Sequence, residues 1–359
     1  MPLGAGSYNT QKGAFTSLMN GDVVEGGSER VTRGLWSNNV GTLAAYHTSS
    51  GQSSTQKQYY YEIYNGVSTT STSEPQFSVA YGHFGGSGSL GGRGVVGNRA
   101  SAAIYSQFSN ILLGPGEDKF KFGGDVVPND CYFITLQRAR LREKMDPGNW
   151  ELHISGSIMG TKGVEGAIKL IDDSGATTNP KVNQGGRVFN IVSGSIVGGT
   201  AQIKTAAASQ TGGGYGLFYP DLGTLVLNPI TLHAHTSMSV ASASNANNNN
   251  AEKLYKHISS SKFGSSRGYF QARREEVISS THYFARVGNK KFNFSSNPTY
   301  FTASDGSFTN PTFFKNPKSY ITQVGMYNDN NELLAVAKLS KPILKSFSRE
   351  AIIKVKLDF

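Results

Sequence analysis

Cysteine is nearly absent from the sequence, since Cys131 is the single cysteine among 359 residues. No disulfide can form within the chain, and a cysteine beside Tyr132-Phe133-Ile134 is expected to be a buried core residue rather than a nucleophile. Long apolar runs are missing too, because no stretch approaches the roughly 18 residues that a membrane span needs. The start, MPLGAGSYNTQKGAF, has neither a basic segment nor a continuous apolar one. The sequence therefore predicts no secretory signal and no membrane insertion.

Charged side chains are scarce as well. Asp, Glu, Lys and Arg make up 16% of the residues, whereas about 25% is typical of soluble domains. A charge-poor surface is typical of proteins that are largely covered by partners. The formal net charge of +10 favours nucleic acid as a partner, but the basic residues are scattered, and the pairs Arg273-Arg274 and Lys290-Lys291 stand alone. We therefore expect no direct nucleic-acid binding, and basic side chains that face solvent or acidic partner proteins.

The N-terminal residues 1–55 are rich in Gly, Ser, Thr and Asn. Such a composition cannot bury enough apolar surface to order by itself, so it predicts an extended polar arm that orders on a partner. Trp36 is either an interface anchor or a plug for the chain's own core. The aromatic run from Tyr59 to Tyr64 predicts the first core strand over 56–65, and Tyr59 and Tyr61 are candidate interface residues.

Alternating apolar residues between turn signals predict a mainly β, multi-domain fold of antiparallel sheets or a β-sandwich, with one or two short helices. The clearest helix signal covers 101–113, where the apolar residues Ile104, Phe108, Ile111 and Leu112 recur at helical spacing. Gly114-Pro115 ends this helix. Further strands are expected over 76–84, 188–192, 270–273 and 281–287.

Residues 131–142 and 150–159 are predicted to form one hairpin around the turn cluster Met145–Asn149. Three arginines, Arg138, Arg140 and Arg142, alternate along the first strand and would share one face of it. Such a ladder suits the carboxylates or phosphates of a neighbouring molecule, which makes the three residues candidate interface residues. The alternative interpretation is an exposed, solvated edge.

Motifs with catalytic chemistry are weak. The spacing of Gly86, Gly88 and Gly91 matches the dinucleotide pattern G-x-G-x-x-G, but neither the helix nor the acidic residue that the pattern requires follows. We interpret this segment as a surface loop. Asp172 and Asp173 are adjacent and would point to opposite faces of a strand, so they are expected to be turn residues rather than a catalytic pair. The sequence predicts no enzymatic activity and no cofactor.

A metal site is suggested only by Leu232-His233-Ala234-His235. On a strand, His233 and His235 would share one face, as two metal ligands do. No third ligand is identifiable nearby, so the two histidines are weak candidates.

The low-complexity stretch 238–250 predicts a linker. The expected organisation is the polar arm over 1–55, a β-rich core domain over 56–232, a linker with a short helix over 233–265 and a C-terminal β domain over 266–359.

The C-terminal domain is expected to end in a hairpin followed by a docked strand. Apolar segments 321–327 and 333–339 flank the turn cluster Asn328–Asn331, and Pro342 is expected to end the second strand. In the last segment every second residue is apolar, and this face consists of Ile353, Val355, Leu357 and Phe359. A terminus of this kind is expected to be held in a sheet, and Phe359 is a further candidate interface residue.

Several segments of the chain resemble a virion structural protein of contractile-tailed phages related to the T-even group. They are VGMYNDNNELLAVAKLSKPILKSFSREAIIKVKLDF at the C-terminus, THYFARVGNKKFNFSSNPTY (281–300), ITLQRARLREKMDPGNWELHIS (134–155) and VTRGLWSNNVGTLAAYHTSS (31–50). The resemblance is an overall likeness of segments and includes no catalytic signature.

This resemblance implies a myovirus tail protein, specifically a wedge-type baseplate subunit that joins neighbouring baseplate or tail-fibre proteins. It implies assembly in the host cytoplasm, a final location in the virion, and partners that include other tail subunits and a second copy of the chain in a homo-dimer or higher oligomer. The alternative is a receptor-recognition protein that binds host glycans through aromatic residues, for which Trp36 and the tyrosines at 59–61 are the candidates.

Overall fold

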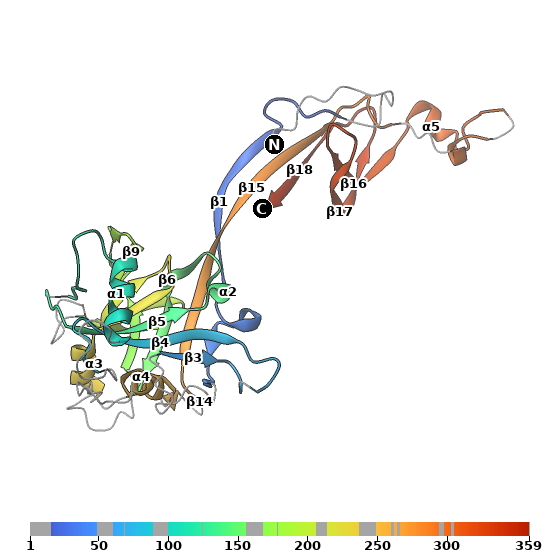
Figure 1. Ribbon diagram of the computed structural model, residues 1–359. Coiled ribbons are helices and arrows are strands. Elements are labelled where there is room, and N and C mark those ends of the chain that lie inside the picture. The colour runs from blue at the N-terminus through green and yellow to red at the C-terminus, as the bar shows by residue number, and fades with distance from the viewer. Residues whose placement is uncertain are drawn as a thin grey trace. The chain divides into compact units, whose positions relative to one another are not determined.

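The computed structural model describes residues 16–48, 60–67, 69–88, 100–123, 125–155, 168–177, 179–205, 214–236, 249–259, 262–263, 266–293, 298–302 and 305–358. They form a mainly β protein, as the sequence predicts (Figure 1). The chain divides into two compact units. Unit 1 comprises Met1–Arg30 and Val277–Phe359, and unit 2 comprises Val31–Glu276. Two strands, β1 (Val23–Gly34) and β15 (Phe270–Val287), contribute residues to both units.

Fourteen strands belong to one sheet. Its main order is β1-β15-β6-β7-β9-β11-β12-β5-β4-β3, while β8 and β10 pair with β9, and β2 and β18 pair with β15. The remaining bounds in this sheet are β2 Thr42–Leu43, β3 Tyr60–Tyr64, β4 Pro75–His83, β5 Asp130–Leu136, β6 Lys144–Ile154, β7 Ile168–Asp172, β8 Lys181–Asn183, β9 Gly186–Val197, β10 Thr200–Thr205, β11 Gly216–Tyr219, β12 Thr224–Leu227 and β18 Ala351–Asp358. Two small sheets pair β13 (Lys262–Phe263) with β14 (Ser266–Arg267) and β16 (Ser319–Tyr327) with β17 (Leu333–Lys345).

In unit 2 buried side chains cover both faces of the sheet. Consecutive residues of β5 belong to two different core clusters. Tyr132 and Ile134 belong to the larger core cluster, whereas Cys131 and Phe133 belong to the smaller one. Because successive side chains of a strand point to opposite faces, the two clusters lie on opposite faces of the sheet. The helix α1 (Ala100–Leu112) packs on the smaller cluster and α4 (Asn249–Ser259) on the larger (Figure 1). Cys131 is fully buried, as predicted.

The helix predicted over 101–113 is confirmed as α1. Its most deeply buried apolar side chains are Tyr105 and Leu112, and the ring of Phe108 stacks on Phe133 at 4.1 Å between centroids. Ile111, expected in the apolar stripe, is exposed. The short helices α2 (Arg138–Leu141), α3 (Pro229–Thr236) and α5 (Thr312–Lys315) were not predicted, because helices of four to eight residues are too short to show a period. Two short 3₁₀ helices, η1 (Ser37–Asn39) and η4 (Pro298–Tyr300), complete the described helices.

The hairpin predicted around Met145–Asn149 is wrong. These residues lie inside β6, which pairs with β15 and β7 and not with β5. Gly148 adopts a φ of +80°, and the pairing of β15 with β6 shifts register next to it, so the segment forms a β-bulge. The chain reverses earlier, through α2 and Arg142, whose φ is +57°.

The two units also divide the chain differently from the predicted domains. Residues of the expected polar arm form β1 and β2, and Leu35, Trp36 and Leu43 belong to the larger core cluster. In the expected linker, 237–248 lie outside the described residues, whereas α4 inserts Leu254 and Ile258 into the same cluster. The separate strands expected over 270–273 and 281–287 are one continuous strand, β15.

In unit 1 the predicted C-terminal hairpin is confirmed as β16 and β17, with Asn331 at a φ of +61° in the turn. Pro342 does not end β17. The register jumps from Ile321 opposite Ile343 to Gln323 opposite Lys338, so the proline lies in a bulge where its missing N–H is not needed. The predicted docked strand is confirmed as β18, which pairs with β15 from Ser280 to Val287.

Candidate interaction surfaces

The aromatic residues predicted as interface anchors are buried within unit 2. Trp36 is 2% exposed, its indole N–H donates to the Phe270 carbonyl at 2.8 Å, and its ring lies 4.9 Å from that of Phe270. Tyr61 is equally buried and stacks on Tyr255 with 6.1 Å between ring centroids. Trp36 therefore takes the core role that was left open above. Tyr59 and Phe359 lie outside the described residues.

The three arginines do not form a ladder. Arg138 and Arg140 lie in α2, and Arg142 follows it. On a helix each residue is rotated by about 100° from the one before it, so residues two apart do not share a face as they would on a strand. Each interacts within unit 2: Arg138 Nη1 donates to the Glu143 carbonyl at 3.3 Å, and Arg142 Nη1 lies 3.5 Å from Glu276 Oε1. The prediction of a shared strand face was wrong because the segment forms a short helix.

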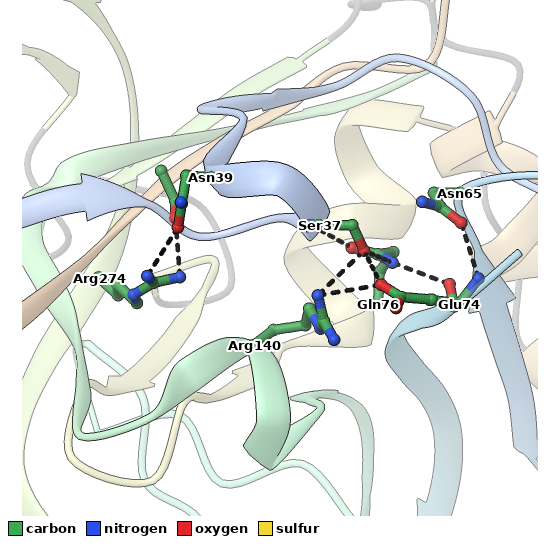
Figure 2. Close-up of polar contacts among 8 residues, drawn as sticks. Ser37, Asn39, Asn65, Glu74, Gln76, Arg140 and Arg274 are labelled. Carbon is green, nitrogen blue, oxygen red and sulfur yellow. Dashed lines mark hydrogen bonds and ion pairs between the residues drawn. The ribbon is translucent and has the colours of Figure 1, made fainter. Parts of the chain in front are cut away.

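Arg140 belongs to a polar network centred on the Ser37 hydroxyl (Figure 2). This hydroxyl donates to Glu74 Oε2 at 2.6 Å, and it accepts from Gln76 Nε2 at 2.7 Å and from Arg140 Nη1 at 3.1 Å. Arg140 also pairs with Glu74 at 3.0 Å. The network joins η1, β4 and α2 and positions the loop that carries Trp36.

The histidine pair lies on α3 rather than on a strand. Residues two apart on a helix are separated by about 200°, so the positions of His233 and His235 do not share a face. His233 is exposed. Among the residues that the structure describes, no group of three or more His, Cys, Asp or Glu side chains is placed to bind a metal ion.

A buried hydrogen bond between a glutamate and a histidine of β6 was not predicted. His153 Nε2 bonds Glu151 Oε1, and both side chains are almost fully buried. The Ile196 N–H donates to Glu151 Oε2 at 2.6 Å, and Lys169 Nζ lies 3.7 Å from Glu151 Oε1. Burial alone would raise the pKa of Glu151, but these hydrogen bonds and charges lower it below its ordinary value. The Glu-x-His spacing on a predicted strand was the available sequence signal.

Ile196, whose N–H binds Glu151, also lines a hollow of about 410 Å³ in unit 2. None of its lining residues is a carboxylate, histidine or cysteine that would supply acid–base or nucleophilic chemistry; they are Thr32, Asn149, Ile196, Gly199, Gln271 and Arg273.

Unit 1 differs from unit 2 because its described residues form no hydrophobic core. All residues of both core clusters belong to unit 2. Proline aside, the buried aliphatic and aromatic side chains in the described part of unit 1 are Val287, Ile353 and Val355. Large apolar side chains are exposed instead, among them Phe314, Tyr320, Tyr327, Leu333, Leu334, Val336, Phe347 and Ile352.

Two regions of unit 1 concentrate this exposure. In the β16–β17 hairpin neither face is buried, and Tyr320 is 64% exposed. In the segment around α5, the ring of Tyr300 lies 5.1 to 5.6 Å from three phenylalanine rings, and the nearby Phe314 is 75% exposed. These surfaces were missed at the sequence level because alternation predicts which residues share a face, not whether anything covers that face.

Comparison with protein-family models, with curated proteins and with solved structures gives no match for this chain. No helix within the described ranges is long and apolar enough to span a membrane.

Proposed function

We propose that this chain is a structural subunit of a contractile phage tail, of the baseplate wedge type, which joins neighbouring baseplate or tail-fibre proteins. The observation that carries the proposal is the exposed apolar surface of unit 1, together with the absence of a core among its described residues. Groups of exposed large apolar side chains are typical of protein interaction sites. The assignment to a phage tail follows from the resemblance of four segments to a tail protein; these segments are 31–50, 134–155, 281–300 and 324–359.

The energetic reason is straightforward. Full burial of one large apolar side chain stabilises a complex by about 1.5–3 kcal/mol. Phe314, Tyr320, Leu334 and Ile352 are each more than half exposed, so a neighbour that covers them contributes several kcal/mol to the stability of unit 1. Permanent interfaces in multi-subunit particles are apolar in this way.

The proposed partners are other tail subunits and a second copy of the chain in a homo-dimer or higher oligomer. The proposed role needs no cofactor, no catalysis, no direct contact with nucleic acid and no membrane insertion. The protein would be assembled in the host cytoplasm and end in the virion. The saturated hydrogen bonds of Ser37 and the fully occupied carboxylate of Glu151 support a structural role for the polar groups of unit 2.

The alternative, recognition of host glycans, loses two of the residues that suggested it, while Tyr60 is 48% exposed and Tyr59 lies outside the described residues. Trp36 and Tyr61 are core residues and offer no platform to a sugar. Phe314 is an exposed ring, but it lies next to Phe308, with centroids 6.2 Å apart, in a group dominated by phenylalanine. Such a group favours an apolar protein pocket over a hydroxyl-rich ligand.

The proposal is tested in the phage that carries the gene. A nonsense codon in the gene should give progeny without complete contractile tails in electron micrographs, and a plasmid copy of the wild-type gene should restore them. A copy with Leu334→Asp should restore fewer tails. Val182→Asp, at a residue of unit 2 that is 74% exposed, is the matched control and should restore them fully. Complete, infectious particles without the chain would refute the proposal.

A further inference from the structure

Lys345, the last residue of β17, is an unusual lysine because its side chain is completely buried. Its Nζ atom donates to three neutral oxygen atoms: the Asn289 carbonyl at 2.7 Å, the Ser346 carbonyl at 2.9 Å and Asn293 Oδ1 at 3.2 Å. Within the described part of the chain, no carboxylate lies at ion-pair distance from this nitrogen. A buried charge without a counter-ion is costly, and a lysine in such surroundings is driven toward its neutral form.

The surroundings of Lys345 favour a nucleophilic amine next to an amide carbon. Burial lowers the pKa of Lys345, while the charge of Glu350 opposes this shift. A neutral, desolvated lysine amine is an activated nucleophile. The side-chain carbonyl carbon of Asn293, Cγ, is one bond of about 1.23 Å from Oδ1, so Nζ lies within about 4.4 Å of it. Asn293 is itself 6% exposed, so water is largely kept from this carbon.

The two side chains are held in place by the turn that precedes them in the sequence. The Asn289 carbonyl oxygen accepts from both Lys345 Nζ and Asn293 Nδ2, the latter at 2.5 Å. The hydroxyl of Ser319, the residue paired with Lys345 at the base of the β16–β17 hairpin, donates to the Phe292 carbonyl at 2.7 Å. Groups that are fixed side by side react far faster than the same groups free in solution.

We propose that the side chains of Lys345 and Asn293 become joined by an amide bond within the folded chain. The ammonium group first loses one proton to water, and neutral Nζ then attacks Asn293 Cγ. The Nζ–Cγ bond forms, the Cγ–Nδ2 bond breaks, and Nδ2 leaves as ammonia with one proton taken from Nζ. The reaction needs no oxidant, reductant or second substrate. Its product is uncharged, so it removes the unpaired ammonium group from the interior of unit 1.

Unit 1 is the part of the molecule where such a bond has most effect. Its described residues form no hydrophobic core, and small units of this kind are usually stabilised by disulfides or metal ions. The single cysteine lies in unit 2, and the described residues include no group placed to bind a metal. An amide bond between residues 293 and 345 closes a loop that contains α5 and the β16–β17 hairpin, which limits the unfolded conformations of this segment.

The test is a tryptic peptide map of the purified full-length chain. Trypsin cleaves after lysine and arginine except before proline, and it does not cleave after a lysine whose amine is acylated. The peptides 292–315 and 339–349 should therefore appear as one linked species, with the sum of their masses less one ammonia, and fragmentation should place the link at Asn293 and Lys345. The intact mass is not sufficient, because an Asn-Gly pair such as Asn20-Gly21 can also lose ammonia by ring closure.

Variants of the turn identify the carbonyl carbon that reacts. Asn293→Ala removes this carbon, so the two peptides should separate and trypsin should cleave after Lys345. Asn289→Ala is the matched control, because Asn289 contributes its backbone carbonyl, which the substitution retains, and this variant should keep the link.

The wild-type chain decides the proposal even where a variant does not fold. Complete tryptic cleavage after Lys345, with an unmodified peptide 292–315, would overturn it. A linked species that persists in Asn293→Ala would overturn the assignment of the bond to Asn293.

Discussion

The indole N–H of Trp36 donates to the carbonyl oxygen of Phe270 at 2.8 Å, and this bond joins residues 234 positions apart in the sequence. It fixes the loop after β1 to β15 inside the core of unit 2. Replacement of Trp36 by Phe keeps an aromatic ring but leaves the buried carbonyl without its donor, which should lower the free energy of unfolding by about 1–3 kcal/mol. Trp36→Ala should cost about 3–5 kcal/mol because it also leaves a cavity.

Urea unfolding followed by the fluorescence of Trp150 measures both changes, since the chain has two tryptophans and the other one is retained. Val40→Ala, at an exposed position of the same loop, is the control and should leave the unfolding midpoint nearly unchanged. A Trp36→Phe protein as stable as the wild type would show that the hydrogen bond contributes nothing.

The loop itself depends on Gly34. A Cβ atom at this position would lie 1.9 Å from the Asn39 carbonyl oxygen, so Gly34→Ala forces the backbone of the loop to move. We expect a loss of about 1–3 kcal/mol or more in the free energy of unfolding. At Gly41 a Cβ would meet no atom within 4 Å. Gly41→Ala is thus the matched control and should be neutral or slightly stabilising. Equal thermal unfolding of the two variants would contradict this account.

The pH dependence of stability should report on Asp146. Burial raises its pKa above the usual value, the charges of Glu275 and Asp172 raise it further, and a hydrogen bond from Asn149 opposes them. The folded state then binds this proton more tightly than the unfolded state. The contribution of Asp146 to the free energy of unfolding therefore increases as the pH falls through the raised pKa toward the ordinary value of 3.8.

Asp146→Asn removes this contribution and retains an acceptor for Asn149. The variant should be more stable than the wild type at pH 7, by about 1.4 kcal/mol for each unit by which the pKa is raised, and the advantage should shrink toward pH 4. Urea unfolding at both values measures the difference. An advantage that is equal at both would rule out a raised pKa.

The two units should differ in local stability. Amide hydrogens in β5 and β12 lie between the two core clusters, whereas those in β16 and β17 belong to a hairpin without a buried face. A hairpin of two strands is marginally stable in water by itself. Hydrogen exchange followed by mass spectrometry should therefore show much faster exchange in 319–345 than in 130–136 for the isolated chain. Equal protection of both segments would contradict this expectation.

The sequence was sufficient where local chemistry decides the structure. The hairpin around Asn328–Asn331, the alternation along β18 and the helix ended by Gly114-Pro115 could each be predicted from a short window. These elements combine a strong period with turn residues whose backbone preferences are unambiguous.

The sequence was insufficient where pairing between distant strands determines the structure. The cluster Asp146-Pro147-Gly148 has the composition of a reversal, yet pairing with β15 on one side and β7 on the other keeps β6 continuous through it. β1 has no apolar alternation, and its place is defined by its neighbour β15. Among the candidate interface residues, Trp36 and Tyr61 were the right type of residue for an anchor but are used in the core.

Unit 1 is built from two segments that are far apart in the sequence, and this affects how it folds during synthesis on the ribosome. Asp22 forms an ion pair with Arg286, 264 residues further on, at 2.5 Å. At about 5–20 residues per second, the N-terminal strand emerges roughly 13–53 seconds before that arginine does. Unit 2 lies wholly within this interval and can fold first, so Asp22 and β1 wait for the C-terminal residues that complete unit 1.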